Sequence, residues 1–258
     1  MTMHTITIYG RKGGTGRTIL TMALAAALVA KCRRVAIADA TLDPMCPVSI
    51  CHAPWAARQH AEGTPETSLA VFPVGPEDSL ADALARARQR GAEIALIDTQ
   101  ARVTPHHHVA AEVTDLVLVP FIGRMEAETV GAHLGEAGER VPIFGVDVGV
   151  EGGAVRRRHV AALYGGPMLH SALPRSELFM RMPAEGRLDR FVAALETPAD
   201  TPDAPSFAAS EAMRRAWVAA QELATEVVWI LEGQTLEPAR ADWAPGATDA
   251  ACARPFLI

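Results

Sequence analysis

Residues 10–18 carry the clearest arrangement of chemistry-bearing residue types in the chain. They read Gly-Arg-Lys-Gly-Gly-Thr-Gly-Arg-Thr, a Walker A frame with Arg17 where lysine is usual. Glycines let backbone N–H groups close around phosphate oxygens, a following helix presents its positive end, and a threonine hydroxyl can ligate Mg²⁺. The segment therefore predicts a phosphate-binding loop. The predicted binding residues are Arg11, Lys12, Gly13, Gly14, Thr15, Gly16, Arg17, Thr18 and Ile19.

Carboxylates end two of the apolar runs. Residues 93–98, Glu-Ile-Ala-Leu-Ile-Asp, form an apolar strand pattern ending in an acid, the Walker B form. Asp98 is predicted to hold Mg²⁺ through water or to hold Thr18. The alternative for such an aspartate is a helix cap. Asp39 ends another apolar run, and the predicted metal-site residues are Thr18 and Asp98, to which the family resemblance given below adds Asp39.

The elements that must position these residues alternate along the chain. Short apolar runs, typical of buried strands, are separated in most cases by helical patterns. This alternation predicts a doubly wound α/β fold, a mostly parallel sheet with helices on both faces and ligands at the carboxyl ends of the strands. The predicted strands are 5–9, 35–38, 69–74, 94–97, 116–120, 143–148 and 168–173, and the predicted helices are 18–31, 80–90, 107–113, 126–139 and 154–164.

The later part of the chain changes composition. We expect one P-loop domain over residues 1–196 and a proline-rich linker or loop over 197–206. Apolar residues at helical spacing then predict a carboxyl-terminal helix over 207–232, packed on the domain. Residues 233–258, rich in Pro, Ala, Asp and Arg, are expected to be a poorly ordered tail.

Composition narrows the function classes. The formal net charge is −6, so any nucleic-acid binding must use a local basic patch. The apolar run 19–30 is shorter than the roughly 20 residues of a bilayer span, and no signal peptide is visible, so we expect a cytoplasmic protein without membrane contact. Four scattered cysteines do not form a disulfide framework. Metal binding by Cys46 and Cys51, or by the histidine run 106–108, is an alternative to a purely structural role.

Lys12 adds a second feature to the loop. The pattern K-G-G-x-G-[K]-T resembles the deviant Walker A ATPases of the ParA/MinD class, P-loop proteins of the SIMIBI type. The resemblance covers roughly the first 230 residues and implies ATP and Mg²⁺ as cofactors. It also implies an ATP-dependent homodimer in which Lys12 reaches the phosphates bound by the other subunit.

Two departures from that family bear on hydrolysis. Arg17 keeps the positive charge of the usual lysine, but its guanidinium is larger and planar. In the family's D-x-D-P segment, Asp39 matches the first aspartate, whereas Thr41 occupies the position of the second, which positions or activates the attacking water. Asp43 restores that aspartate only if two residues are looped in. The resemblance assigns catalytic roles to Lys12, Arg17, Asp39 and Asp43 and adds Asp39 to the metal site, while the two departures predict slow ATP hydrolysis.

Later segments extend the resemblance. Residues 116–120 match the family's next strand, and residues 170–176 resemble the segment that packs on the adenine, which assigns Pro174 and Arg175 to nucleotide binding. The order of the segments looks most like small plasmid-type ParA proteins and VirC-type ATPases of conjugative DNA transfer.

A cluster of arginines supplies the candidate DNA surface. ParA-like dimers bind DNA non-specifically through basic residues of their carboxyl half, and several cations on one face give salt-sensitive affinity. The alternative is a solvated face paired with nearby acids. The candidate DNA-binding residues are Arg156, Arg157, Arg158, Arg187 and Arg190.

Together these features predict an ATP-dependent dimerising switch. The ATP-bound dimer would associate with the nucleoid or with an unidentified partner protein that stimulates hydrolysis, and would position or segregate a DNA or protein cargo. One rival hypothesis is a nucleotide-dependent binding module with little or no ATPase activity, which Arg17 and Thr41 favour. Another is a MinD-like membrane-positioning ATPase, which would need a terminal amphipathic helix.

Overall fold

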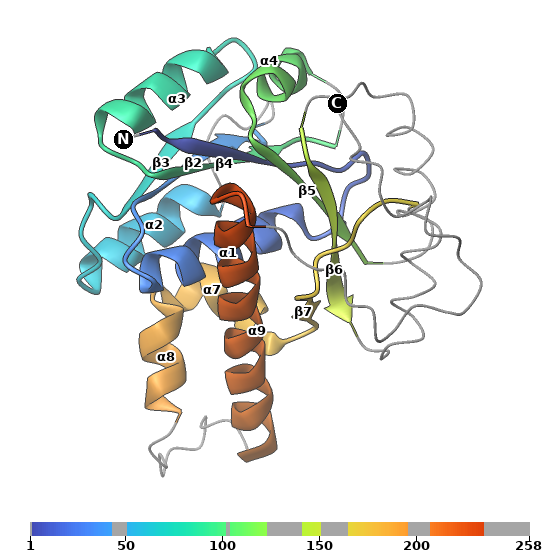
Figure 1. The fold of residues 1–258 in the computed structure, drawn as a ribbon. Helices are drawn as coiled ribbons and strands as arrows, with labels where there is room; N and C mark the ends of the chain where they lie inside the picture. The colour runs from blue at the N-terminus through green and yellow to red at the C-terminus, as the bar shows by residue number, and fades with distance from the viewer. Residues whose placement is uncertain are drawn as a thin grey trace.

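A seven-stranded parallel sheet forms the centre of the molecule (Figure 1). The computed structural model describes residues 2–42, 51–101, 104–122, 141–150, 165–195 and 207–234. Its strand order is β3-β2-β4-β1-β5-β6-β7, so β4 lies between β2 and β1. The strands are β1 (His4–Ile8), β2 (Val35–Ala40), β3 (Leu69–Pro73), β4 (Ile94–Thr99), β5 (Leu116–Phe121), β6 (Ile143–Val150) and β7 (Leu173–Pro174).

Helices cover both faces of this sheet. On one face lie α1, α2, α7, α8 and α9, whose apolar side chains form one core cluster with the sheet. On the other face α3 and α4 form a second cluster. The described helices are α1 (Arg17–Ala30), α2 (His52–Ala61), α3 (Leu80–Gln89), α4 (Pro105–Val113), α7 (Glu177–Glu185), α8 (Leu188–Ala194) and α9 (Phe207–Leu231).

The strand sequences explain the two layers. Val35 and Ile37 face the α1 side, while Ala36 and Ala38 face the α3 side, because successive strand residues point to opposite faces. All four are buried, which is why the run contains no polar alternation.

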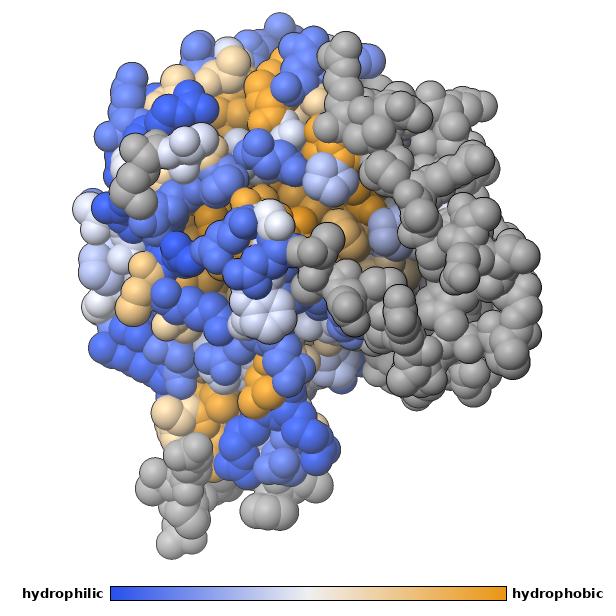
Figure 2. Space-filling view, viewed as in Figure 1, coloured by the Kyte–Doolittle hydropathy of each residue, from blue (hydrophilic) through white to orange (hydrophobic). Residues whose placement is uncertain are grey.

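Helix α9 lies along α1 on the larger cluster (Figure 1). Its buried residues Met213, Trp217, Ala220 and Ala224 recur at intervals of three and four, as expected for one face of a helix. Figure 2 shows a largely hydrophilic surface over the described part of this side, with apolar residues visible in narrow seams. Among the described helices, none is long and apolar enough to cross a membrane.

The predicted doubly wound α/β fold is confirmed, but the last strand was predicted too long. Met168 makes an isolated bridge to Gly145, and β7 begins only at Leu173. Between these points the buried Glu226 carboxylate accepts hydrogen bonds from the backbone N–H groups of His170 and Ser171, at 2.6 and 2.8 Å. A side chain thus takes the place of a strand partner.

Helices α2, α7 and α8 were not predicted from the sequence. The predictions of helices over 126–139 and 154–164, of a linker over 197–206 and of a tail beyond residue 234 lie outside the described residues.

Candidate nucleotide site

The loop after β1 exposes its backbone. Residues 11–14 are exposed, and a Cβ atom added at Gly13 or Gly14 would meet nothing within 4 Å. Gly14 and Gly16 have φ of 78° and 84°, the left-handed region that glycine enters at little cost. The side chain missing at Gly13 and Gly14 therefore leaves open space beside the backbone at the end of β1.

Helix α1 turns its positive end toward this loop. It begins at Arg17, and in the part of the chain that the structure describes no side chain caps it and no acidic residue lies in its first turn. The Thr15 hydroxyl is buried and has no hydrogen-bond partner there. An uncapped helix start with a free buried hydroxyl favours an anion such as phosphate.

Gly16 also fixes the approach of the loop to the sheet. A Cβ atom at this position would lie 2.9 Å from Cγ1 of Val148 on β6. Both the close contact and the positive φ require glycine here, which ties the loop to the edge formed by the strand ends.

The strand register places two aspartates side by side at this edge. Asp39 on β2 and Asp98 on β4 are direct register partners, and Ile8, the last residue of β1, pairs with Asp98 on the other side. Both carboxylates are buried, with Asp98 fully so. The carboxyl ends of β1, β2 and β4 thus converge beneath the loop, as expected for a parallel sheet.

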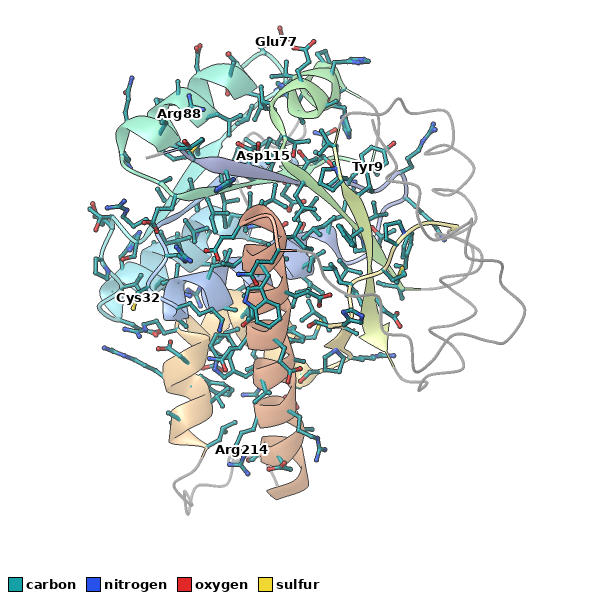
Figure 3. All side chains as sticks on the ribbon, viewed as in Figure 1. Tyr9, Cys32, Glu77, Arg88, Asp115 and Arg214 are labelled. Atoms are coloured by element: carbon teal, nitrogen blue, oxygen red, sulfur yellow. The ribbon has the colours of Figure 1, made fainter. Side chains whose placement is uncertain are left out.

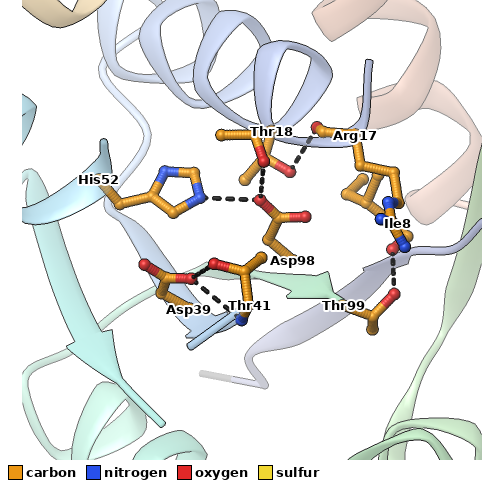
Figure 4. A network of polar contacts seen from close by, with 9 residues as sticks. Ile8, Arg17, Thr18, Asp39, Thr41, His52, Asp98 and Thr99 are labelled. Carbon is orange, nitrogen blue, oxygen red and sulfur yellow. Dashed lines mark hydrogen bonds and ion pairs between the residues drawn. The ribbon is translucent and has the colours of Figure 1, made fainter. Parts of the chain in front are cut away.

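Thr18 and Asp98 are in contact (Figure 4). The Thr18 hydroxyl donates to Asp98 Oδ2 over 2.9 Å, and Asp98 Oδ1 is buried without a hydrogen-bond partner among the described residues. Because the Thr18 proton is used by Asp98, the lone pairs of its oxygen remain for a cation. Hydroxyl and carboxylate oxygens are the donors that Mg²⁺ prefers, so these residues fit the metal.

His52, which sequence reasoning missed, completes this network. Its Nε2 lies 2.8 Å from Asp98 Oδ2, and both side chains are at most 1% exposed. Burial acts to lower the pKa of His52, but the hydrogen bond to Asp98 and the charges of Asp98 and Asp39 outweigh burial and raise it. The sequence feature that could have indicated α2, and with it His52, is Pro54, because proline is compatible with the first turn of a helix.

Thr41 is hydrogen-bonded to Asp39, two residues before it in the chain. Its hydroxyl and its backbone N–H both donate to Asp39 Oδ1, the latter over 3.2 Å. The Thr41 side chain therefore serves as a donor to the first aspartate of this segment. Asp43 lies outside the described residues.

Arg17 folds onto its own loop. Its Nη1 donates to the carbonyl oxygen of Gly10 over 2.5 Å, and its pKa is lowered because it is desolvated by burial, an effect that the nearby Asp98 and Tyr9 oppose. This hydrogen bond links the start of α1 to Gly10, the first residue of the loop.

The other residues predicted to bind the nucleotide are spread over the loop, α1 and the end of β7. Lys12 and Arg11 are exposed in the loop, and Ile19 packs against the core from α1. Pro174 is half-buried in β7, next to β6, and Arg175 is exposed directly after it.

One of the candidate DNA-binding arginines, Arg187, is paired with a carboxylate, as is Arg214 elsewhere in the carboxyl half. Arg187 forms a 2.5 Å ion pair with Asp189, whereas Arg190 is exposed. Arg214, near the start of α9 and away from Tyr9 in Figure 3, pairs with Glu211 at 3.2 Å. Arg156, Arg157 and Arg158 lie outside the described residues.

Two of the three histidines suspected of metal binding have hydrogen-bond partners within the fold. His106 Nε2 lies 2.9 Å from the carbonyl oxygen of Gly75, and His107 Nδ1 accepts from the backbone N–H of Thr104 at the start of α4. Across the described ranges, no three His, Cys, Asp or Glu side chains are grouped so as to hold a metal ion. Cys46 lies outside those ranges.

The chain is similar to a known protein family in sequence and to several solved structures in fold. The family model described as VirC1 protein matches residues 3–129. No curated protein gives a significant sequence match. The fold is similar to a ParA family ATPase from Chlorobium tepidum (TM-score 0.54, 12% identity, 84% of this chain and 99% of that one). It is also similar to the MinC:MinD cell division complex of Aquifex aeolicus (TM-score 0.55, 15% identity, 91% and 97%).

A further similar structure contains ligands. It is described as cobyrinic acid a,c-diamide synthase from Mycobacterium smegmatis with bound ADP and magnesium, with a TM-score of 0.56, 15% identity, and coverage of 93% of this chain and 100% of that one. At these identities the likeness of the solved structures shows the fold.

The chain therefore has the fold of the ParA and MinD proteins to which it is similar, with a glycine loop after β1. Over residues 3–129 in particular, its sequence is similar to that of the VirC1 protein family.

Proposed function

We propose that the chain binds ATP with Mg²⁺ at residues 10–18 and acts as an ATP-dependent switch. The observation that carries this proposal is the Thr18–Asp98 hydrogen bond beneath an uncapped helix start and an exposed glycine loop. Thr18 and Asp98 Oδ1 would hold Mg²⁺, and the bound metal would neutralise phosphate charge. The ligands named for similar structures, ADP with magnesium in one of them, support the same assignment.

ATP would bring two copies together through Lys12. Lys12 is an exposed residue of the loop. The family resemblance supports a contact across the dimer, with Lys12 of each copy on the nucleotide of the other. Dimerisation would then depend on ATP because the phosphates supply the partner charge.

The ATP-bound dimer would bind DNA or a protein cargo and position it. The exposed Arg190 and the run Arg156–Arg158 are the proposed DNA contacts, with Arg187 available only after its ion pair with Asp189 opens. The relationship to VirC1 and the likeness to ParA and MinD proteins support a positioning role, in partition or in DNA transfer.

Hydrolysis would reset the switch slowly. Thr41 donates to Asp39 and lacks a carboxylate, and Arg17 is engaged with Gly10. The same two observations favour a second candidate function, a nucleotide-dependent binding module without useful turnover.

Turnover measured with and without DNA separates the two functions. Phosphate release that stops in the Thr18→Ala variant and rises with DNA or a partner protein supports the switch. ATP-dependent DNA binding at low salt, without phosphate release above that of Thr18→Ala, supports the binding module. Absence of ATP binding in the wild type would overturn both.

A further inference from the structure

We propose that His52 is a positioning residue of the magnesium site, acting through Asp98. Its imidazole holds Asp98 Oδ2 so that Oδ1 is the oxygen left for the metal or for a metal-bound water. This inference rests on the proposed Mg²⁺–ATP site. It adds His52 to that site, a residue of α2 that lies outside the glycine loop and outside β2 and β4, the strands that carry Asp39 and Asp98.

Two donors meet on one oxygen of Asp98. His52 Nε2 lies 2.8 Å and Thr18 Oγ1 lies 2.9 Å from Oδ2, whereas Oδ1 has no hydrogen-bond partner in the part of the chain that the structure describes (Figure 4). Because the acceptor is a carboxylate, Nε2 must carry the proton. With Oδ2 held from both sides, the carboxylate is oriented before any metal arrives.

The imidazole is itself held in place by helix α2. Further along this helix, Trp55 Nε1 and Gln59 Nε2 both donate to the carbonyl oxygen of Gly186 over 3.1 Å. At its end, Glu62 Oε2 accepts from the backbone N–H of Arg187 over 2.7 Å. These bonds fix α2 to the junction of α7 and α8, so His52 cannot simply follow a displaced Asp98.

The arrangement gives His52 a definite effect on metal affinity. Residues that orient metal-binding groups by hydrogen bonds commonly contribute about 10- to 100-fold to metal affinity. A positive imidazole near the site would act in the opposite direction by repelling Mg²⁺. Because His52 and the metal would use different oxygens of Asp98, we expect orientation to outweigh repulsion.

The test compares three substitutions of His52 that differ in their donors. His52→Gln places an amide N–H near the former Nε2, His52→Asn is too short to reach Oδ2, and His52→Leu fills volume without a donor. Binding of a fluorescent ATP analogue is titrated against Mg²⁺, and the Mg²⁺ concentration at half-maximal binding is recorded. Gln59→Leu serves as the control, because it removes one hydrogen bond of α2 to Gly186 but leaves those made by Trp55 and Glu62, and the His52–Asp98 contact, in place.

The expected result is a midpoint about 10- to 100-fold higher in His52→Leu and His52→Asn, with His52→Gln and Gln59→Leu close to the wild type. If His52→Leu does not fold, the Asn and Gln pair still decides the outcome. A midpoint unchanged or lowered in His52→Asn, one raised equally in Asn and Gln, or one raised equally in Gln59→Leu would overturn the proposal. Failure of the wild type to bind the analogue at any Mg²⁺ concentration would instead contradict the proposed function.

Discussion

Thr18 and Asp98 are 80 residues apart in sequence, yet the hydroxyl of one donates a 2.9 Å hydrogen bond to the carboxylate of the other. The contact joins the start of α1 to the end of β4. It exists because β1 and β4 are parallel neighbours, and Ile8, the last residue of β1, is in register with Asp98, the residue before the end of β4. The glycine loop therefore opens directly above a buried carboxylate.

Gly16→Val should weaken ATP binding by about 100-fold or more. The substitution forces a β-branched residue to φ 84° and places its Cβ 2.9 Å from Val148, so the loop must move and lose phosphate contacts each worth about 1.5–3 kcal/mol. Gly91→Val is the matched control, since φ there is 78° and the nearest atom is 3.8 Å away. Calorimetry showing equal ATP affinity in both variants would argue against the loop as the site.

Lys12→Ala should abolish or strongly reduce ATP-dependent dimerisation while leaving nucleotide binding by the monomer largely intact. The reason is that its proposed contact acts across the interface. Sedimentation velocity with Mg²⁺ and a non-hydrolysable ATP analogue measures the dimer fraction. Lys31→Ala, which removes the chain's other lysine at the far end of α1, is the control and should behave as the wild type. Equal dimer fractions for both variants would refute the role of Lys12.

Basal ATP hydrolysis should be slow, well below one turnover per second, even with DNA present. A water-positioning carboxylate contributes about 10²- to 10⁴-fold, and Thr41 cannot supply it. Thr41→Asp should raise the rate if residues 39–44 have the assigned register, whereas Asp43→Ala should lower it if Asp43 has taken over the role. Fast wild-type turnover that neither substitution changes would show that the segment is not the hydrolytic switch.

Asp189→Asn should destabilise the protein at neutral pH but not in acid. Burial acts to raise the Asp189 pKa, but the hydrogen bonds and charge of Arg187 outweigh burial and lower it. A lowered folded-state pKa means that ionised Asp189 stabilises the protein above its unfolded pKa of about 3.9, and that this stability is lost as pH falls through the folded value.

For a partly exposed pair the difference should be at most about 1 kcal/mol. Urea unfolding of wild type and Asp189→Asn between pH 7 and pH 3 measures it. A difference that stays constant over this range would contradict an electrostatic origin.

The parts of the fold that sequence predicted well are those fixed by local pattern. The run before Gly10, the glycines and the alanine-rich stretch after Thr18 specify strand, loop and helix without help from distant residues. The apolar run ending at Asp98 likewise specifies β4. Parallel packing then follows because these runs are apolar on both faces.

The parts that sequence did not reveal depend on partners distant in the chain. His52 belongs to the site only because α2 docks on Gly186, which lies more than a hundred residues away. The strand predicted over 168–173 fails because Glu226, on the last described helix, takes backbone N–H groups that a strand would have offered to a neighbour. Neither contact is indicated by a pattern in the sequence around the residues that make it.

Binding of Mg²⁺–ATP through Thr18 is tested by calorimetric titration of ATP into the wild type and into Thr18→Ala, each with Mg²⁺ and with EDTA. We expect the wild type to bind ATP more tightly with Mg²⁺, and Thr18→Ala to bind it weakly and with no gain from Mg²⁺, because the hydroxyl that contacts Asp98 is gone. Equal affinity in the two proteins, with the same response to Mg²⁺, would contradict it.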